Sequence, residues 1–185
     1  MSKAPVQTLT TPVVTAAYAH LAQPDEGQQY SDGKYKVTCL VKKDGGHDDF
    51  VKSFEEKCEE AAVTEWNEVP KNLQTPLRDG DENQKEDFHG SWLITGKTKF
   101  RPPYFDCAKP PSPLIEGQEP KSGDLVRAKL KLQPYTMGRN KGIAVQLLAV
   151  QLVEKRNMSS VANIEFDEID GYVADASDSE DDGDF

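Results

Sequence analysis

Residues 125–133 constrain the fold most, because apolar and polar side chains alternate there without interruption. The apolar positions are Val126, Ala128, Leu130 and Leu132, and the polar positions are Arg127, Lys129, Lys131 and Gln133. A period of two residues is typical of a β-strand with one buried face. Residues 143–153 are almost continuously apolar, as in a strand buried on both faces, and residues 134–142 predict a loop between the two strands. The sequence therefore predicts a β-hairpin whose outer face is basic.

Other segments predict further strands and one helix. Residues 34–41 alternate in polarity, which predicts a half-buried strand with Tyr35, Val37, Cys39 and Val41 on its apolar face. Apolar residues at helical spacing predict an amphipathic helix from Asp48 to Trp66, with Asp48 and Asp49 placed to cap its N-terminus and to complement the helix dipole there. The remaining predictions are short strands over 16–21, 88–95 and 99–105, the last two joined near Gly96, a polar loop over 69–87, and a stiff proline-rich connector over 110–122.

These elements favour a mainly β protein. Four to six strands with one inserted α-helix fit a small, partly open five-stranded barrel such as the OB-fold, whose loops and one face bind oligonucleotides. A chain of 185 residues has room for one such domain and an appendage. We expect the domain to span residues 1–157, with residues 1–15 as a flexible arm, and residues 158–185 to form an acidic, disordered tail.

The negative charge of the chain is concentrated at one end. The formal net charge is −10, yet ten of the 32 acidic residues lie in residues 158–185, which contain no Lys or Arg. Residues 1–157 are therefore neutral overall, with 22 acidic and 22 basic residues. Residues 96–157 alone hold 12 basic and 5 acidic residues, a balance of +7. Such asymmetry is typical of a nucleic-acid-binding protein with an acidic tail.

The basic face of the predicted hairpin suits a nucleic-acid backbone. Alternate side chains of a strand repeat every ~6.6 Å, so the three cations of residues 127–131 would be spaced like successive phosphates of an extended strand. The alternative is a solvated strand face that charge keeps soluble. Neighbouring residues favour nucleic acid, because Tyr135, Arg139 and Lys141 would add an aromatic ring and two cations beside the same face. Stacking rings among phosphate-neutralising cations are typical of proteins that bind single strands.

Other aromatic residues lie next to basic ones and form a second group of candidate DNA contacts. Lys34 and Lys36 flank an aromatic residue, and Phe100 precedes Arg101, with Tyr104 three residues further on. For each of these rings, a place in the core is the alternative, since aromatic residues dominate small cores.

Enzymatic chemistry finds little support in the sequence. The three histidines, His20, His47 and His89, show no metal-ligand spacing with the cysteines, and no glycine-rich phosphate loop or nucleophile motif occurs. We therefore expect a protein that is not an enzyme and that uses no metal or cofactor. Three widely spaced cysteines do not suggest a disulfide framework, and no apolar run is long enough for a membrane span. These features predict a soluble cytoplasmic protein with no membrane partner.

The acidic tail ends in an aromatic residue. Residues 175–185 are too charged and too poor in apolar side chains to fold alone. A role in solubility would explain the acids but not Phe185, which combines a ring with the terminal carboxylate and fits an apolar pocket rimmed by Lys or Arg. The candidate partner-binding residues are Glu180, Asp181, Asp182, Asp184 and Phe185.

The order of several short motifs resembles one protein family. The matching stretches are residues 17–25 (AYAHLAQPD), 33–37 (GKYKV), 58–61 (CEEA), 130–135 (LKLQPY) with the apolar strand to Val153, 171–174 (GYVA) and the terminal 180–185 (EDDGDF). Together they cover most of the chain. The chain is similar in these features to the single-stranded DNA-binding proteins of short-tailed phages of the T7 type.

This resemblance implies an OB-fold that coats single-stranded DNA in phage DNA replication, recombination and repair, in the cytoplasm of an infected bacterium. It implies that Tyr135 stacks on a base, that Arg127 or Lys129 contacts phosphate, and that Lys3 assists. It also implies a tail that binds the replicative DNA polymerase and the helicase-primase, and a homodimer whose tails occupy the DNA groove when DNA is absent. The chain departs from the family at Ser31-Asp32, where the family has a DNA-contacting arginine, and Lys34 and Lys36 are placed to compensate.

Two alternatives remain open from the residues themselves. An acidic interaction protein could use the tail to mimic nucleic acid, but that hypothesis leaves the basic strand unexplained. A general DNA-binding protein would also bind duplex DNA, because phosphate contacts alone do not separate the two forms of DNA.

Overall fold

Five strands pair in a closed cycle and form a barrel. The computed structural model describes residues 7–27 and 31–156. The barrel strands are β2 (Val14–His20), β3 (Tyr35–Lys42), β5 (Ser91–Thr98), β7 (Leu125–Met137) and β8 (Asn140–Glu154). They pair in the order β2, β3, β5, β8, β7 and back to β2, and only the β5–β8 contact among these described strands is parallel. With the helix α1 (Asp48–Trp66) inserted between β3 and β5, this is the predicted OB-fold.

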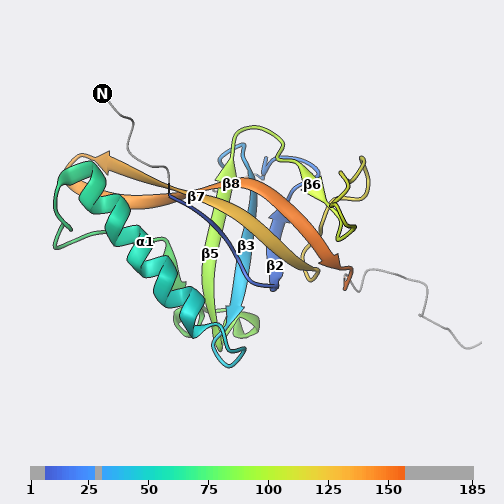
Figure 1. Cartoon of the computed structure of the whole chain (residues 1–185), viewed down its shortest axis with the longest axis horizontal. Coiled ribbons are helices and arrows are strands. Elements are labelled where there is room, and N and C mark those ends of the chain that lie inside the picture. Colours follow the sequence, from blue (N-terminus) through green and yellow to red (C-terminus); the bar gives the residue numbers. More distant parts are fainter. Residues whose placement is uncertain (1–6, 28–30, 157–185) are drawn as a thin grey trace, which may run out of the picture.

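Short strands extend three of the barrel strands. The strand β1 (Thr8–Thr10) pairs with β7, β4 (Leu77–Asp79) pairs with β5, and β6 (Tyr104–Phe105) pairs with β8. The long β7–β8 hairpin crosses the other barrel strands and reaches past them toward one end of α1 (Figure 1). These additions widen the sheet around the barrel without breaking its closure.

The core follows the alternation predicted from the sequence. Val126, Ala128 and Leu130 of β7 are completely buried, and Val37, Cys39 and Val41 of β3 face them in the same cluster. The helix α1 has its predicted bounds and buries Phe54, Cys58, Ala61 and Ala62 against this cluster. The predicted capping by Asp48 and Asp49 is wrong, since His47 precedes the helix without a capping side-chain hydrogen bond. Both acids do lie in the first turn, where they complement the helix dipole as predicted.

Gly96 lies within β5 and does not join two strands, so that prediction is wrong. A Cβ added at Gly96 would lie 3.0 Å from Leu130 Cδ2 and 3.3 Å from Leu147 Cβ. The glycine is therefore the residue that lets β7 and β8 approach β5 closely. As a result β5 continues to Thr98, and the strand predicted over 99–105 is reduced to β6.

The hairpin has a much shorter loop than predicted. Residues 134–142 belong mostly to the two strands, and only Gly138 and Arg139 connect Met137 to Asn140. Gly138 has φ +62°, which suits the first central position of a type II′ turn. Pro134 is tolerated because its nitrogen points to the same side as the Leu132 N–H, which donates to the Gln7 carbonyl and faces away from β8. β8 also alternates in burial, with Ala144 exposed, and is not buried on both faces.

Two segments predicted without regular structure contain short elements. Within residues 1–15, the described part includes β1 and the fully buried Thr11, so this part is not a flexible arm. Residues 69–87 contain β4, the one-turn helix η1 (Gly80–Glu82) and the start of the one-turn helix η2 (Glu86–Phe88). Phe88 anchors this segment by packing with Ala17, Leu40 and Leu93 on the outer surface of the barrel, which is also why Leu40 is buried.

Candidate functional site

The outer face of β7 carries the predicted row of cations, Arg127, Lys129 and Lys131, which we call the β7 row. Arg127 and Lys129 are exposed and Lys131 is half-buried, whereas the residues between them are buried. Arg127 makes long hydrogen bonds of 3.5 Å, from Nε to the Thr11 carbonyl and from a terminal nitrogen to the side chain of Gln151. Within residues 7–27 and 31–156, Lys129 and Lys131 form no ion pair. Their ammonium groups are therefore available to an external anion.

Tyr135 continues this row toward the hairpin tip. It pairs with Gly142 across the hairpin, and a Cβ added at Gly142 would lie 2.6 Å from the tyrosine ring. The ring thus lies directly over the glycine backbone, and its hydroxyl donates to Gln74 Oε1 at 3.1 Å. Tyr135 also borders, with Lys131 and Gln133, a hollow of about 370 Å³. These contacts fix an aromatic ring beside the basic row.

Lys141 does not join this face, contrary to the prediction. It pairs with Thr136, one residue beyond Tyr135, and therefore points to the opposite side of the hairpin. Its ammonium lies 5.3 Å from the ring centre of Trp66 on α1. Arg139 lies in the exposed two-residue turn. The misplacement of Lys141 follows from treating residues 134–142 as a loop.

Strand pairing places further polar residues beside Lys131, in a line across the barrel. Lys131 pairs with Gln146 of β8, Gln146 with Lys97 of β5, and Lys97 with Lys36 of β3. Paired residues point to the same face of a sheet, and neighbouring strands lie about 4.8 Å apart. We call these four residues the cross-strand row. It runs perpendicular to the β7 row and shares Lys131 with it, so the two rows form one continuous polar path.

A groove of about 420 Å³ lies at the far end of the cross-strand row, on the outer face of β2, β3 and β5. We call it the β3–β5 groove. Its lining residues with aromatic or basic side chains are Tyr18, His20, Lys36, Arg78, Phe88 and Lys97. Tyr18 has φ +46° at the point where the β2–β3 register shifts, and at this bulge the residue is 43% exposed. The ring packs edge-on against Phe88, with 5.4 Å between centroids, and Lys85 Nζ lies 4.4 Å from its centre.

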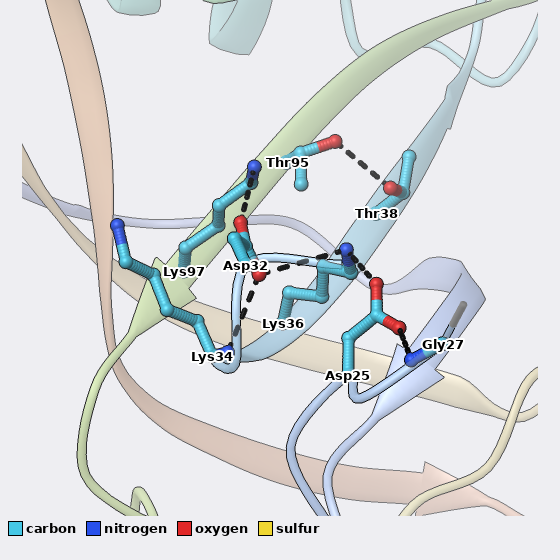
Figure 2. A network of polar contacts seen from close by, with 8 residues as sticks. All are labelled: Asp25, Gly27, Asp32, Lys34, Lys36, Thr38, Thr95 and Lys97. Carbon is cyan, nitrogen blue, oxygen red and sulfur yellow. Dashed lines mark hydrogen bonds and ion pairs between the residues drawn. The ribbon is translucent and has the colours of Figure 1, made fainter. Parts of the chain in front are cut away.

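Two carboxylates lie among the cations of this groove (Figure 2). Asp32 Oδ2 is 2.8 Å from Lys97 Nζ, and Lys36 Nζ forms ion pairs with both Asp25 and Asp32. The hydrogen bond from Lys97 holds the pKa of Asp32 below its usual value, and bonds from Lys36 and the Gly27 N–H do the same for Asp25. Lys36 was predicted as a DNA contact, but in this structure its charge is already compensated.

Only some residues of the second group of predicted DNA contacts lie next to the polar path. Lys34 and the 81% exposed Phe100 line a hollow of about 220 Å³ together with Lys97 and Gln133 of the polar path. Arg101 instead forms an ion pair with the buried Glu119.

Tyr104 is a core residue, so its assignment as a DNA contact is wrong. It is 4% exposed, and its hydroxyl donates to the Leu21 carbonyl at 2.6 Å. Burial raises the pKa of this phenol. The neighbouring basic residues suggested a DNA contact, but the hydrogen-bond partner lies 83 positions away in the chain.

Tyr18, His20, Arg78 and Lys97 were missed as groove residues. For Lys97 a local pattern existed, because Leu93, Thr95 and Lys97 alternate along β5 once Gly96 is accepted as a strand residue. The other three come together only through strand pairing. Lys3 and the tail residues from Glu180 to Phe185 lie outside the described residues.

Metal and membrane sites are not indicated in the described part of the chain. No group of three or more His, Cys, Asp or Glu side chains there is arranged to hold a metal ion. Cys39 and Cys58 are buried, which raises the pKa of each thiol to about 12, and Cys107 is exposed. Among these residues no helix is both long and apolar enough to span a membrane.

Comparison with known proteins places the chain among phage proteins. The profile of the family described as Enterobacter phage Enc34, ssDNA-binding protein, matches residues 7–181. A search of curated protein sequences finds no match.

Solved structures of phage proteins share the fold. The single-stranded DNA-binding protein from bacteriophage Enc34, solved in complex with ssDNA, has a TM-score of 0.68 and 22% identity, over 80% of this chain and 86% of that one. Another structure of the Enc34 protein has a TM-score of 0.68 and 20% identity, over 85% and 87%. The single-stranded DNA-binding protein gp2.5 of bacteriophage T7 has a TM-score of 0.57 and 21% identity, over 90% of this chain and all of that one.

Proposed function

The chain belongs to the family of the single-stranded DNA-binding protein of Enterobacter phage Enc34, and on this premise we propose how it binds single-stranded DNA. The strand lies along the β7 row and passes at Lys131 onto the cross-strand row. The observation that carries this proposal is the pair of ammonium groups of Lys129 and Lys131, which form no ion pair with the described residues, beside the fixed ring of Tyr135. The protein acts by binding alone and catalyses no reaction.

The proposed contacts are independent of base sequence. Arg127, Lys129 and Lys131 neutralise phosphates, which every nucleotide carries, and Tyr135 stacks on a base face, which every base presents. Phe100 and Tyr18 are exposed rings further along the path that serve as additional stacking positions. Such a surface binds any single strand, and its affinity falls steeply with salt.

Fluorescence anisotropy with a labelled oligothymidylate at two salt concentrations tests this function. We expect tight binding at low salt and a strong loss at high salt. Absence of binding at low salt would exclude the proposal. Competition with unlabelled duplex of the same length measures the preference for single strands, because phosphate contacts alone would not produce one.

Replacing Tyr135 with Ala should weaken binding about tenfold at both salt concentrations, because base stacking contributes ~1–3 kcal/mol and is not ionic. Tyr135→Phe is the matched control: it keeps the ring and removes only the hydrogen bond to Gln74. The Phe variant should bind nearly as well as the native chain. Equal losses in the two variants would show that the hydroxyl, and not stacking, matters.

We further propose that residues 158–185 compete with DNA for the polar path and recruit other proteins. The ten acidic residues of this segment give it a negative charge, like that of a DNA strand. The residues from Glu180 to Phe185 would bind the replicative DNA polymerase and the helicase-primase, in line with the terminal motif. The protein would then coat and protect single strands, as a homodimer, during phage replication, recombination and repair in the infected cell.

Deleting residues 158–185 should tighten DNA binding about tenfold at low salt and much less at high salt, because screening weakens the competition. Removing Phe185 alone keeps all ten acidic side chains and should leave DNA affinity unchanged. Anisotropy titrations of the three proteins make the comparison. Unchanged affinity after the full deletion would limit the segment to recruiting partners.

A further inference from the structure

Two cations of the β3–β5 groove, Lys36 and Lys97, differ from those of the β7 row in having acidic partners within the same surface. They face the carboxylates of Asp25 and Asp32, so the charges of these two lysines are compensated. Figure 2 shows the Lys36 ammonium between the two carboxylates, with Lys97 reaching Asp32 from β5. A phosphate approaching either lysine therefore meets an oxyanion already in place.

Both carboxylates are positioned by the backbone around them. Asp32 Oδ1 accepts the Lys34 N–H at 3.3 Å, and Asp25 Oδ1 accepts the Gly27 N–H at 3.2 Å. The Asp25 N–H donates to the Lys34 carbonyl, and the Gly33 N–H donates to the Asp25 carbonyl. These bonds fasten both acids to the start of β3. The carboxylates are therefore directed at Lys36 and Lys97 and do not reach them by chance from a distant surface.

The ion pairs are also accessible enough to exchange. The side chains of Asp32 and Lys97 are 27% and 44% exposed. Solvent-accessible ion pairs contribute little to stability, because water and salt screen them. A phosphate can therefore replace Asp32 at Lys97 without first exposing a buried charge. Exchange at Lys36 is harder, because the side chains of Lys36 and Asp25 are only 15% and 16% exposed.

We propose, building on the proposed DNA binding, that Asp25 and Asp32 act as internal competitors that occupy the phosphate positions of the β3–β5 groove. A DNA strand binds first along the uncompensated β7 row. It enters the groove only when its phosphates replace these carboxylates as the partners of Lys97 and Lys36. The groove is thus a second part of the binding site, weaker than the first, and Asp32 sets its affinity because it contacts both lysines.

Asp32→Asn tests the proposal. The amide keeps an oxygen that can accept the Lys34 N–H but loses the negative charge. We expect single-stranded DNA to bind about five- to tenfold more tightly at low salt, with the salt dependence steeper by about one phosphate contact. Asp44→Asn removes the same charge from an exposed turn outside the groove, and it should change affinity less than twofold.

A second substitution shows whether Lys97 carries the effect. Lys97→Gln should cost more affinity in the Asp32→Asn background than in the native chain, where Asp32 already compensates Lys97. Thermal unfolding checks that each variant is folded. Equal affinities of the Asp32→Asn and Asp44→Asn variants, weaker binding by Asp32→Asn, or equal costs of Lys97→Gln in both backgrounds would each overturn the proposal. If the native chain fails to bind at low salt, the DNA-binding function itself is wrong, so the two failures are distinguishable.

Discussion

Replacing both Lys129 and Lys131 with Glu should weaken single-stranded DNA binding by about 100-fold or more at low salt, equivalent to about 2.7 kcal/mol. Both residues point outward from β7 and have no acidic partner among the described residues. Reversal removes two phosphate contacts and adds repulsion. The loss should shrink as salt rises, because each contact contributes about 0.7 to the logarithmic salt slope of a single strand. Anisotropy titrations at several salt concentrations measure both effects.

A double reversal elsewhere controls for net charge. Lys52 on α1 and Lys71 just after it are exposed, and neither lines the β7 row, the cross-strand row or the groove. Lys52→Glu with Lys71→Glu changes the total charge equally and should weaken binding by no more than about threefold at low salt. If both double variants lose affinity to the same extent, overall charge and not the β7 row governs binding.

Replacing Gly80 with Ala should destabilise the folded chain by at least about 3 kcal/mol. Gly80 begins η1, and a Cβ there would lie 2.0 Å from the Phe88 carbonyl oxygen and 2.6 Å from the Ser91 carbonyl oxygen. Both atoms belong to the backbone, so no side-chain rotation relieves the clash. The segment that carries Phe88, and with it one wall of the β3–β5 groove, would have to move. Urea unfolding followed by circular dichroism gives the change in free energy.

Gly27→Ala provides the control for that experiment. The nearest atom to a Cβ at Gly27 is Asp25 Oδ1 at 3.4 Å, an ordinary contact, and its φ is not positive. This substitution should change the free energy of unfolding by less than about 0.5 kcal/mol. A similar small effect at Gly80 would mean that η1 adjusts without disturbing the barrel.

The sequence predicted the elements whose patterns are long and self-consistent. Residues 125–133 alternate through nine positions, and the helix repeats its apolar spacing over five turns, so local periodicity was enough to place both. Gly96 misled the prediction because a glycine in a strand and a glycine in a turn look alike locally. Its actual role depends on Leu130 and Leu147, which approach it from other strands.

The sequence likewise predicted only one of the two parts of the candidate DNA-binding surface. The β7 row could be predicted because its cations lie on one strand. The β3–β5 groove could not, since β2, β3, β4 and β5 each contribute between one and three residues and only pairing brings them together. Asp32 illustrates the limit well: its departure from the family pattern was visible in the sequence, but its contact with Lys97, 65 positions away, was not.

The pairing of Lys97 with Gln146 has a mechanical consequence. Among the described residues it is the one register position that joins β5 to β8, so a single residue pair closes the barrel at this seam. The cross-strand row passes directly over this seam. A DNA strand bound along the row would contact β5 through Lys97 on one side of the seam, and β8 and β7 through Gln146 and Lys131 on the other. The bound DNA would then also hold β5 and β8 together, so the DNA-bound barrel would resist opening better than the free one.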